Sequence, residues 1–117
     1  MTPKKLARSF AWALAGISYA FKTQRNMKIH GLAVIVVASA GFYAGLTRIE
    51  WAIISVTVFM VLSAETINTA IEKTVDLVTD NYHPLAELAK NLAAGAVLLT
   101  AINALVIAGL IFGHHFR

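Results

Sequence analysis

Residues 65–76 read Glu-Thr-Ile-Asn-Thr-Ala-Ile-Glu-Lys-Thr-Val-Asp, and this stretch lies at the end of a membrane-length apolar run. It contains three of the chain's six acidic residues. On an α-helix, at ~100° per residue, four of its polar side chains share an arc of about 80°. These four are Glu65, Asn68, Glu72 and Asp76. Polar groups at membrane depth are costly, so this face predicts a functional site.

The chain as a whole has the composition of a membrane protein. Of its 117 residues, 58% are hydrophobic and 14% are charged, whereas soluble domains contain about 25% charged residues. The mean hydropathy is +0.69. There is no cysteine, which excludes disulfide bonds and thiolate metal sites.

Basic charge is concentrated near the N-terminus, where six of the ten Lys and Arg residues fall within the first 28 positions. Beside apolar spans, such a cluster favours anionic lipid headgroups and a cytoplasmic location. Nucleic acid is the other partner that basic charge can indicate. No nucleic-acid recognition motif supports that alternative, and we expect no nucleic-acid partner.

The hydropathy pattern predicts an all-α integral membrane protein with a single domain over residues 1–117. In residues 3–25, apolar side chains recur every three or four positions opposite a basic face, which is typical of an amphipathic helix in the membrane interface. A cleaved signal peptide is the alternative, but the interrupted apolar residues and the missing small-residue cleavage pattern argue against it. The expected transmembrane helices are residues 28–47, 50–79 and 84–113.

The positive-inside rule places the N-terminus in the cytoplasm, the turn at 46–50 outside and the turn at 80–84 inside. If Trp51 marks the outer interface, Glu65 lies about 21 Å further along the helix axis at 1.5 Å per residue. It is then roughly 9 Å short of the inner boundary of a ~30 Å hydrocarbon core. The acidic face therefore runs from lipid depth into the cytoplasm.

The residue types on this face suit phosphoryl transfer to a lipid alcohol. Glu72 and Asp76 can hold Mg²⁺ through oxygen ligands, and the depth of Glu65 suits a general base toward a hydroxyl. Lys73 and Lys90 can neutralise phosphate charge. A proton or ion pathway that uses the buried carboxylates is the alternative of another class. There is no Walker A sequence or Gly-rich kinase loop, so a nucleotide site would be of another type.

Histidines outside this face have simpler interpretations. We interpret His30, near a membrane boundary, as a polar tip that reaches the interface. His114 and His115 are expected to form an exposed tail.

A known pattern accounts for the acidic stretch. Written with its variable positions, it is Glu65-x-Ile67-Asn68-Thr69-Ala70-Ile71-Glu72-x-x-Val75-Asp76. It resembles the signature of the prokaryotic diacylglycerol kinase family at every specified position. Residues 23–30, 82–86 and 89–99 extend the resemblance over nearly the whole chain. The stretch from residue 76 to 86 is more similar to the undecaprenol kinase branch than to the enterobacterial diacylglycerol kinases.

The resemblance implies a bacterial inner-membrane kinase that forms a homotrimer, with active sites between subunits at the cytoplasmic interface. It implies Mg²⁺ with ATP as phosphoryl donor, and undecaprenol, or alternatively diacylglycerol, as acceptor. By the same resemblance Glu65 corresponds to the catalytic base and Glu72 to a metal ligand. The other corresponding residues are polar groups of the site or contact the nucleotide: Asn68, Asp76, Asn81, Tyr82, His83, Lys90 and, as weaker matches, Lys5 and Trp12.

Two positions depart from the family pattern. The family often has a Glu that assists metal binding where this chain has Gln24, whose amide oxygen can coordinate a metal or its nucleotide complex without charge. The family has Asp after the lysine of the last helix, and this chain has Asn91. We expect an Asp at position 91 to support higher activity.

Overall fold

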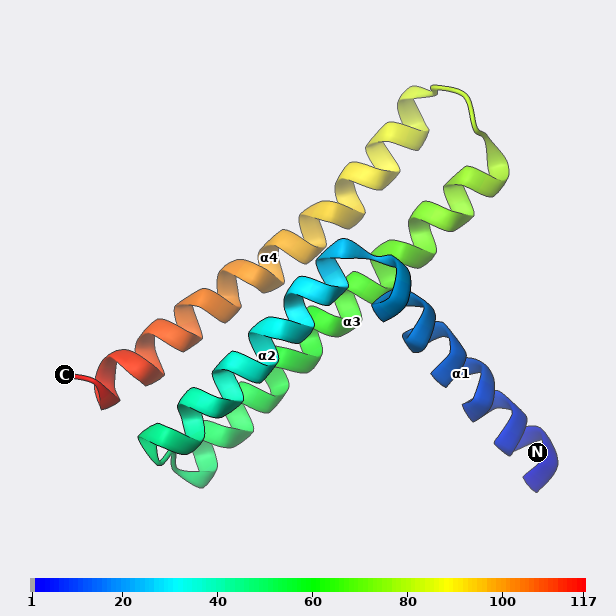
Figure 1. Ribbon diagram of the computed structural model, residues 1–117. Coiled ribbons are helices and arrows are strands. Elements are labelled where there is room, and N and C mark those ends of the chain that lie inside the picture. Colours follow the sequence, from blue (N-terminus) through cyan, green and yellow to red (C-terminus); the bar gives the residue numbers. More distant parts are fainter. Residues whose placement is uncertain (1) are drawn as a thin grey trace.

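The computed structural model describes residues 2–117, and this part of the chain contains four α-helices. They are α1 (Pro3–Thr23), α2 (Arg25–Ala44), α3 (Arg48–Val78) and α4 (Pro84–His115). The two longest, α3 and α4, form an antiparallel pair, while α2 runs beside them and α1 leads away from the bundle (Figure 1). By length and composition, α2, α3 and α4 can each cross a membrane. The all-helical fold with three membrane-length apolar helices is confirmed.

Helix α3 begins at a reciprocal cap. The Thr47 hydroxyl accepts a hydrogen bond from the Glu50 amide at 3.2 Å, and the Glu50 carboxylate accepts one from the Thr47 amide at 2.9 Å. Such a capping box satisfies two backbone donors that the first helical turn leaves free. It sets the point at which the chain leaves the short turn after α2.

The turn between α2 and α3 requires glycine at two positions. Gly45 ends α2 with a φ of +72°, in the left-handed region that glycine adopts without strain. Gly41 lies where α2 approaches the next helix closely. A Cβ atom there would be 2.6 Å from Cη2 of Trp51 and 2.9 Å from Cδ1 of Leu46.

The residue that caps the N-terminus of α4 is one that the family resemblance assigns to nucleotide contact. His83 Nδ1 accepts a hydrogen bond from the Leu85 amide at 3.1 Å, and Pro84 occupies the first helical position. Proline is favoured there because a backbone N–H in the first helical turn has no acceptor within the helix, so its absence removes no hydrogen bond. His83 therefore starts α4, whatever further contact its other ring nitrogen makes.

The buried core is small and lies near the α2–α3 turn. Leu46, Ile54 and Ile111 form it, joining the start of α3 to the end of α4. At the same end, His115 Nε2 lies 2.9 Å from both carboxylate oxygens of Glu50. The expectation of an exposed histidine tail is wrong for His115, because this pair ties the end of α4 to the first turn of α3.

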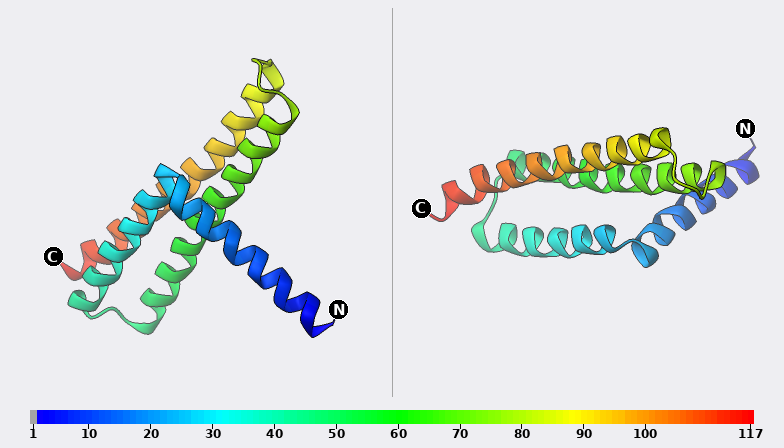
Figure 2. Two further views of the ribbon diagram at one scale, coloured as in Figure 1. Left: turned by 45° about the vertical axis from the view of Figure 1, so that its right-hand side comes forward. Right: turned by 90° about the horizontal axis from the view of Figure 1, so that it is seen from above.

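Most large apolar side chains of the long helices face outward. Leu99, Leu105 and Leu110 of α4, for example, are 71%, 75% and 68% exposed. An apolar surface of this extent is unfavourable in water and matches helices surrounded by lipid or by other subunits. The two further views show a thin arrangement in which α2 stands apart from the α3–α4 pair along part of its length (Figure 2).

Candidate active site

The four polar residues that share the acidic face of α3 become more exposed along the helix. Glu65 is 2% exposed and Asn68 is 6% exposed, whereas Glu72 is half-buried and Asp76 is exposed. Their spacing places them on one face of α3, as the sequence predicted. The face therefore connects a buried carboxylate with the polar end of the α3–α4 pair.

Hydrogen bonds within this face leave two buried acceptors unused. The Asn68 Nδ2 donates to Glu72 Oε1 at 3.3 Å. Glu65 Oε2 and Asn68 Oδ1 are buried without a hydrogen-bond partner among the described residues. Buried polar atoms normally have partners, and leaving one unpaired costs about 1–3 kcal/mol. Two such atoms one turn apart indicate a place where a ligand supplies the missing donor or cation.

A basic residue of α4 completes the polar end of the face. Lys90 Nζ lies 2.7 Å from Asp76 Oδ1, across the turn between α3 and α4. Both side chains are about half exposed, at 42% and 54%, so the pair contributes little to stability in solvent. It does bring a positive charge beside the Asp76 carboxylate. Asn91 follows Lys90 on α4 and is exposed.

His30 lies against the buried carboxylate, and sequence reasoning missed this. Its Nε2 is 3.9 Å from Glu65 Oε2, with the His30 side chain 20% exposed. The interpretation of His30 as an interfacial polar tip is therefore wrong. A signal was present in the sequence, because His30 is a titratable residue inside the otherwise uncharged stretch from residue 29 to 47. What the sequence lacked was the pairing of α2 with α3.

Helix α1 contacts this region through its C-terminal part. Lys73 Nζ lies 5.6 Å from the centroid of the Tyr19 ring. Hydrogen bonding with Lys73, and then with Thr23, lowers the pKa of the Tyr19 phenol. Lys73, expected to neutralise phosphate, is therefore engaged by α1.

The weaker matches on α1 are not brought to the acidic face. Trp12 is 68% exposed, and Lys5 lies further toward the N-terminus, where α1 leads away from the bundle (Figures 1 and 2). Any role of these two residues at a site would need another subunit or a different position of α1.

Within residues 2–117, the remaining predicted residues make no hydrogen bond or ion pair with these carboxylates. Asn81, Tyr82 and His83 form the exposed turn between α3 and α4, with Tyr82 79% exposed. Gln24 is at the junction of α1 and α2, where its Nε2 donates to the Thr23 hydroxyl at 3.2 Å. Within residues 2–117 no hydrogen bond or ion pair joins Gln24 to Glu72.

The donor set fits a hard cation brought in with a phosphate ligand. On this face Glu72 and Asn68 offer carboxylate and amide oxygens, the donors that Mg²⁺ prefers. No group of three or more Asp, Glu, His or Cys side chains in the described part of the chain could hold a metal by itself. Mg²⁺ commonly binds through one or two carboxylates plus substrate phosphates, and this face is suited to that arrangement.

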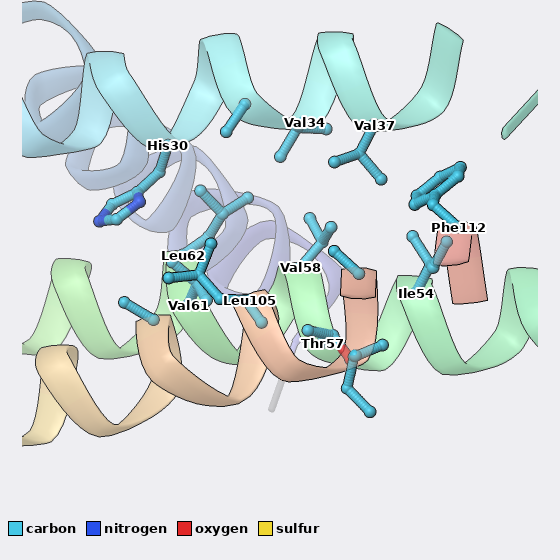
Figure 3. A pocket seen from close by; sticks show the side chains of 15 residues that line it. His30, Val34, Val37, Ile54, Thr57, Val58, Val61, Leu62, Leu105 and Phe112 are labelled. Atoms are coloured by element: carbon cyan, nitrogen blue, oxygen red, sulfur yellow. The ribbon is translucent and has the colours of Figure 1, made fainter. Parts of the chain in front are cut away.

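An apolar cavity of about 260 Å³ lies between α2 and the α3–α4 pair. Its lining is almost wholly aliphatic, from residues such as Val34, Val58 and Leu105, with Phe112 toward one end and His30 toward the other (Figure 3). Leu62, one helical turn before Glu65, also contributes to the wall. The cavity is therefore hydrocarbon-lined, and its histidine end is the one beside Glu65.

Fold and site together define a helical membrane protein. One face of α3 runs from a buried carboxylate to an exposed polar end that offers oxygen donors for a cation. Comparison with known proteins agrees. The profile of the family described as "Prokaryotic diacylglycerol kinase" matches residues 11–112. The chain belongs to the prokaryotic diacylglycerol kinase family.

Individual relatives carry two different names. The chain is 46% identical over 105 residues to the undecaprenol kinase of Bacillus subtilis, covering 90% of this chain and 85% of that protein. It is 47% identical over 102 residues to the diacylglycerol kinase of Synechocystis sp., covering 86% of this chain. The chain spans 58% of the length of the Synechocystis protein. Identity to the diacylglycerol kinase of Escherichia coli is 26% over 110 residues, which cover 94% of this chain and 88% of that protein.

Proposed function

We propose that this protein phosphorylates a membrane lipid alcohol with ATP and Mg²⁺, and that undecaprenol is its preferred acceptor. The observation that carries the proposal is the buried Glu65 carboxylate, with one oxygen unpaired, on a face that leads to Glu72, Asp76 and Lys90. Membership of a kinase family supports the same chemistry.

In this mechanism Glu65 positions and deprotonates the acceptor. The hydroxyl oxygen forms a bond to the γ-phosphorus, and the bond from that phosphorus to the β,γ-bridging oxygen breaks, so that ADP leaves with the electron pair. The hydroxyl proton passes to the Glu65 carboxylate. ATP would supply the phosphoryl group, and a Mg²⁺ ion bound with it would neutralise part of the charge on its phosphates.

The polar end of the face would hold the nucleotide. Glu72, supported by Asn68 and Gln24, supplies oxygen ligands, and Lys90 offers a cation toward phosphate. To bind phosphate, the Lys90 ammonium group must then leave the Asp76 carboxylate or contact both groups at once. The exposed turn at residues 81–83 lies at the same end and could contact the nucleotide, as could Asn91.

The proposed assembly is a homotrimer in the bacterial inner membrane with a cytoplasmic N-terminus. Two observations support it: the outward apolar surfaces of α2, α3 and α4, and the basic residues near the N-terminus. In such an assembly α1 lies in the membrane interface, and Trp12 and Lys5 can reach the site of another subunit. A shared site would also enclose a lipid tail and a nucleotide, which three thin helices alone do not.

Undecaprenol is preferred over diacylglycerol for two reasons. The Bacillus relative named undecaprenol kinase matches over most of its own length. The apolar cavity beside Glu65 also offers hydrocarbon contacts, which suit an isoprenoid chain. Diacylglycerol is the second candidate, favoured by the name of the Synechocystis relative. A non-enzymatic proton or ion pathway would use the same carboxylates without phosphate transfer.

Transfer of labelled γ-phosphate from ATP to undecaprenol and to diacylglycerol, each in mixed micelles, separates these candidates. We expect product with both lipids and higher kcat/KM with undecaprenol. Transfer to neither lipid, with measurable proton or ion flux in vesicles, would support the pathway instead.

A substitution at Glu65 tests its proposed role as the general base. Glu65→Gln should fold and assemble like the unaltered protein but turn over ~10²-fold more slowly or worse, the usual scale for loss of a general base. Glu87→Gln, which removes an exposed carboxylate from the first turn of α4, is the matched control. Near-normal turnover in Glu65→Gln would remove Glu65 from the role of base.

A further inference from the structure

One side chain of α2 faces the carboxylate that the mechanism uses. His30 Nε2 and Glu65 Oε2 are 3.9 Å apart, and the Glu65 oxygen accepts no hydrogen bond from the described residues. A separation of 3.9 Å is too long for a hydrogen bond. The two polar atoms therefore face each other without a direct hydrogen bond, and the Glu65 oxygen is closed to solvent in this structure.

A hydroxyl oxygen can bridge the two atoms once a neighbouring side chain moves to make room for it. At about 2.8 Å from the carboxylate oxygen and about 2.9 Å from a ring N–H, it would make both contacts with an angle of roughly 90° between them. It would donate its hydrogen to Glu65 Oε2 and accept one from His30 Nε2–H. This arrangement uses the neutral imidazole with its proton on Nε2. It also satisfies the buried carboxylate oxygen that is otherwise unpaired.

The surroundings of His30 show which molecule would carry that hydroxyl. His30 lines the apolar cavity between α2 and the α3–α4 pair (Figure 3). Thr57 is the other polar side chain of the lining, and its hydroxyl donates to the Ile53 carbonyl within α3 at 2.7 Å. The histidine thus stands where a hydrocarbon-lined space meets the buried carboxylate. An alcohol with an apolar chain matches both sides of this boundary.

We propose that His30 binds the acceptor hydroxyl jointly with Glu65 and orients its oxygen for transfer. This inference rests on the proposed lipid kinase function. Glu65 takes the proton, and His30 keeps its own proton and holds the oxygen. The pair would fix the hydroxyl in a defined position before the nucleotide arrives, which is how positioning lowers a reaction barrier.

Steady-state kinetics of three variants test the assignment. His30→Leu should lower kcat/KM for undecaprenol about tenfold, the scale of one hydrogen bond, with KM for ATP unchanged. His30→Gln keeps an N–H donor at a similar reach and should retain most of the activity. Ser39→Ala removes an exposed hydroxyl from the same helix outside the cavity and should change neither constant. Equal losses in His30→Leu and His30→Gln, or an unaltered kcat/KM in His30→Leu, would overturn the proposal.

A binding measurement keeps this proposal separate from the proposed function. In protein labelled with ¹⁵N-histidine, the His30 ring signals, assigned by their loss in His30→Gln, should shift when the prenyl alcohol farnesol is added. The hydrocarbon farnesene, which has the same chain without the hydroxyl, should not reproduce the shift. A shift with farnesol but no phosphate transfer by the unaltered protein would refute the kinase proposal and leave the hydroxyl site standing. Transfer without any hydroxyl-dependent shift would refute the role of His30 alone.

Discussion

At the scale of single residues, the position of Glu65 is costly and therefore informative. An acidic side chain at the centre of a membrane helix costs roughly 2.5–3.5 kcal/mol on insertion scales. The described part of the protein does little to offset this cost, because one carboxylate oxygen is unpaired and the nearest cationic candidate is 3.9 Å away. A group held at such cost is typical of sites where a bound ligand completes the hydrogen bonding.

Glu72 should show its role through metal dependence. Glu72→Gln keeps the shape of the side chain and its contact with Asn68 but removes the charge that a hard cation prefers. We expect the Mg²⁺ concentration for half-maximal transfer to rise about tenfold or more, since even residues that only support a ligand change metal affinity by ~10–100-fold. The measurement is transfer rate against Mg²⁺ at saturating ATP and lipid, with Glu87→Gln as control. An unchanged titration would assign Glu72 to packing or to ATP contact.

Asn91 tests whether the charge of the family aspartate at this position contributes to the proposed kinase activity. An Asp there could accept hydrogen bonds as an anion, bind metal or orient Lys90, and an amide can do only part of this. We expect Asn91→Asp to raise specific activity at saturating lipid, ATP and Mg²⁺. Thermal stability in detergent should stay level or fall slightly, because a negative charge is added near Asp76. Without a gain in activity, the family aspartate would not act through its charge.

At the scale of elements, close approach between α2 and α3 depends on one glycine. Gly41 lets the end of α2 lie against Trp51 at the start of α3. The same turn contains the left-handed Gly45 and the Thr47 cap. This corner sets how far apart the two helices are, and so helps place His30 relative to Glu65 further along.

A methyl group at position 41 should therefore destabilise the bundle. Gly41→Ala places a Cβ within 3 Å of Trp51 and Leu46 side-chain atoms, and overpacking of this kind costs typically 1–3 kcal/mol. The midpoint of thermal or denaturant unfolding in detergent should fall accordingly. Gly16→Ala is the matched control, since an added Cβ there has no heavy atom within 4 Å. Equal effects of the two substitutions would mean that the corner relaxes freely.

At the scale of the whole molecule, the chain is too thin to work as an isolated bundle in water. Within residues 2–117 the largest fully buried side chains are Met27 and Glu65, and the buried apolar core is small. Lipid and neighbouring subunits would have to cover the outward apolar faces. The proposed trimer does this, and it offers α1 a surface on which to bring Trp12 toward a site.

The orientation of the three long helices can be measured by labelling, and the chain's lack of cysteine simplifies the design. Single cysteines at Arg48 and Asp80 are suitable because both positions are exposed, whereas the neighbouring hydroxyls of Thr47 and Thr79 bond to backbone groups. With a cytoplasmic N-terminus, Arg48→Cys should react with an impermeant reagent from outside intact cells. Asp80→Cys should react only after the cytoplasmic face is opened. Labelling of both from the same side would contradict three crossings.

The sequence by itself determined the helices and the acidic face of α3. Both follow from local rules: apolar runs of membrane length specify spanning helices, and the 3.6-residue repeat places residues 65, 68, 72 and 76 together. Tertiary structure alone decided which residues from other helices meet that face. His30 beside Glu65, Lys90 on Asp76 and His115 on Glu50 depend on how helices pair. Pairing is set by packing at turns such as Gly41–Gly45, and no periodicity within one helix encodes it.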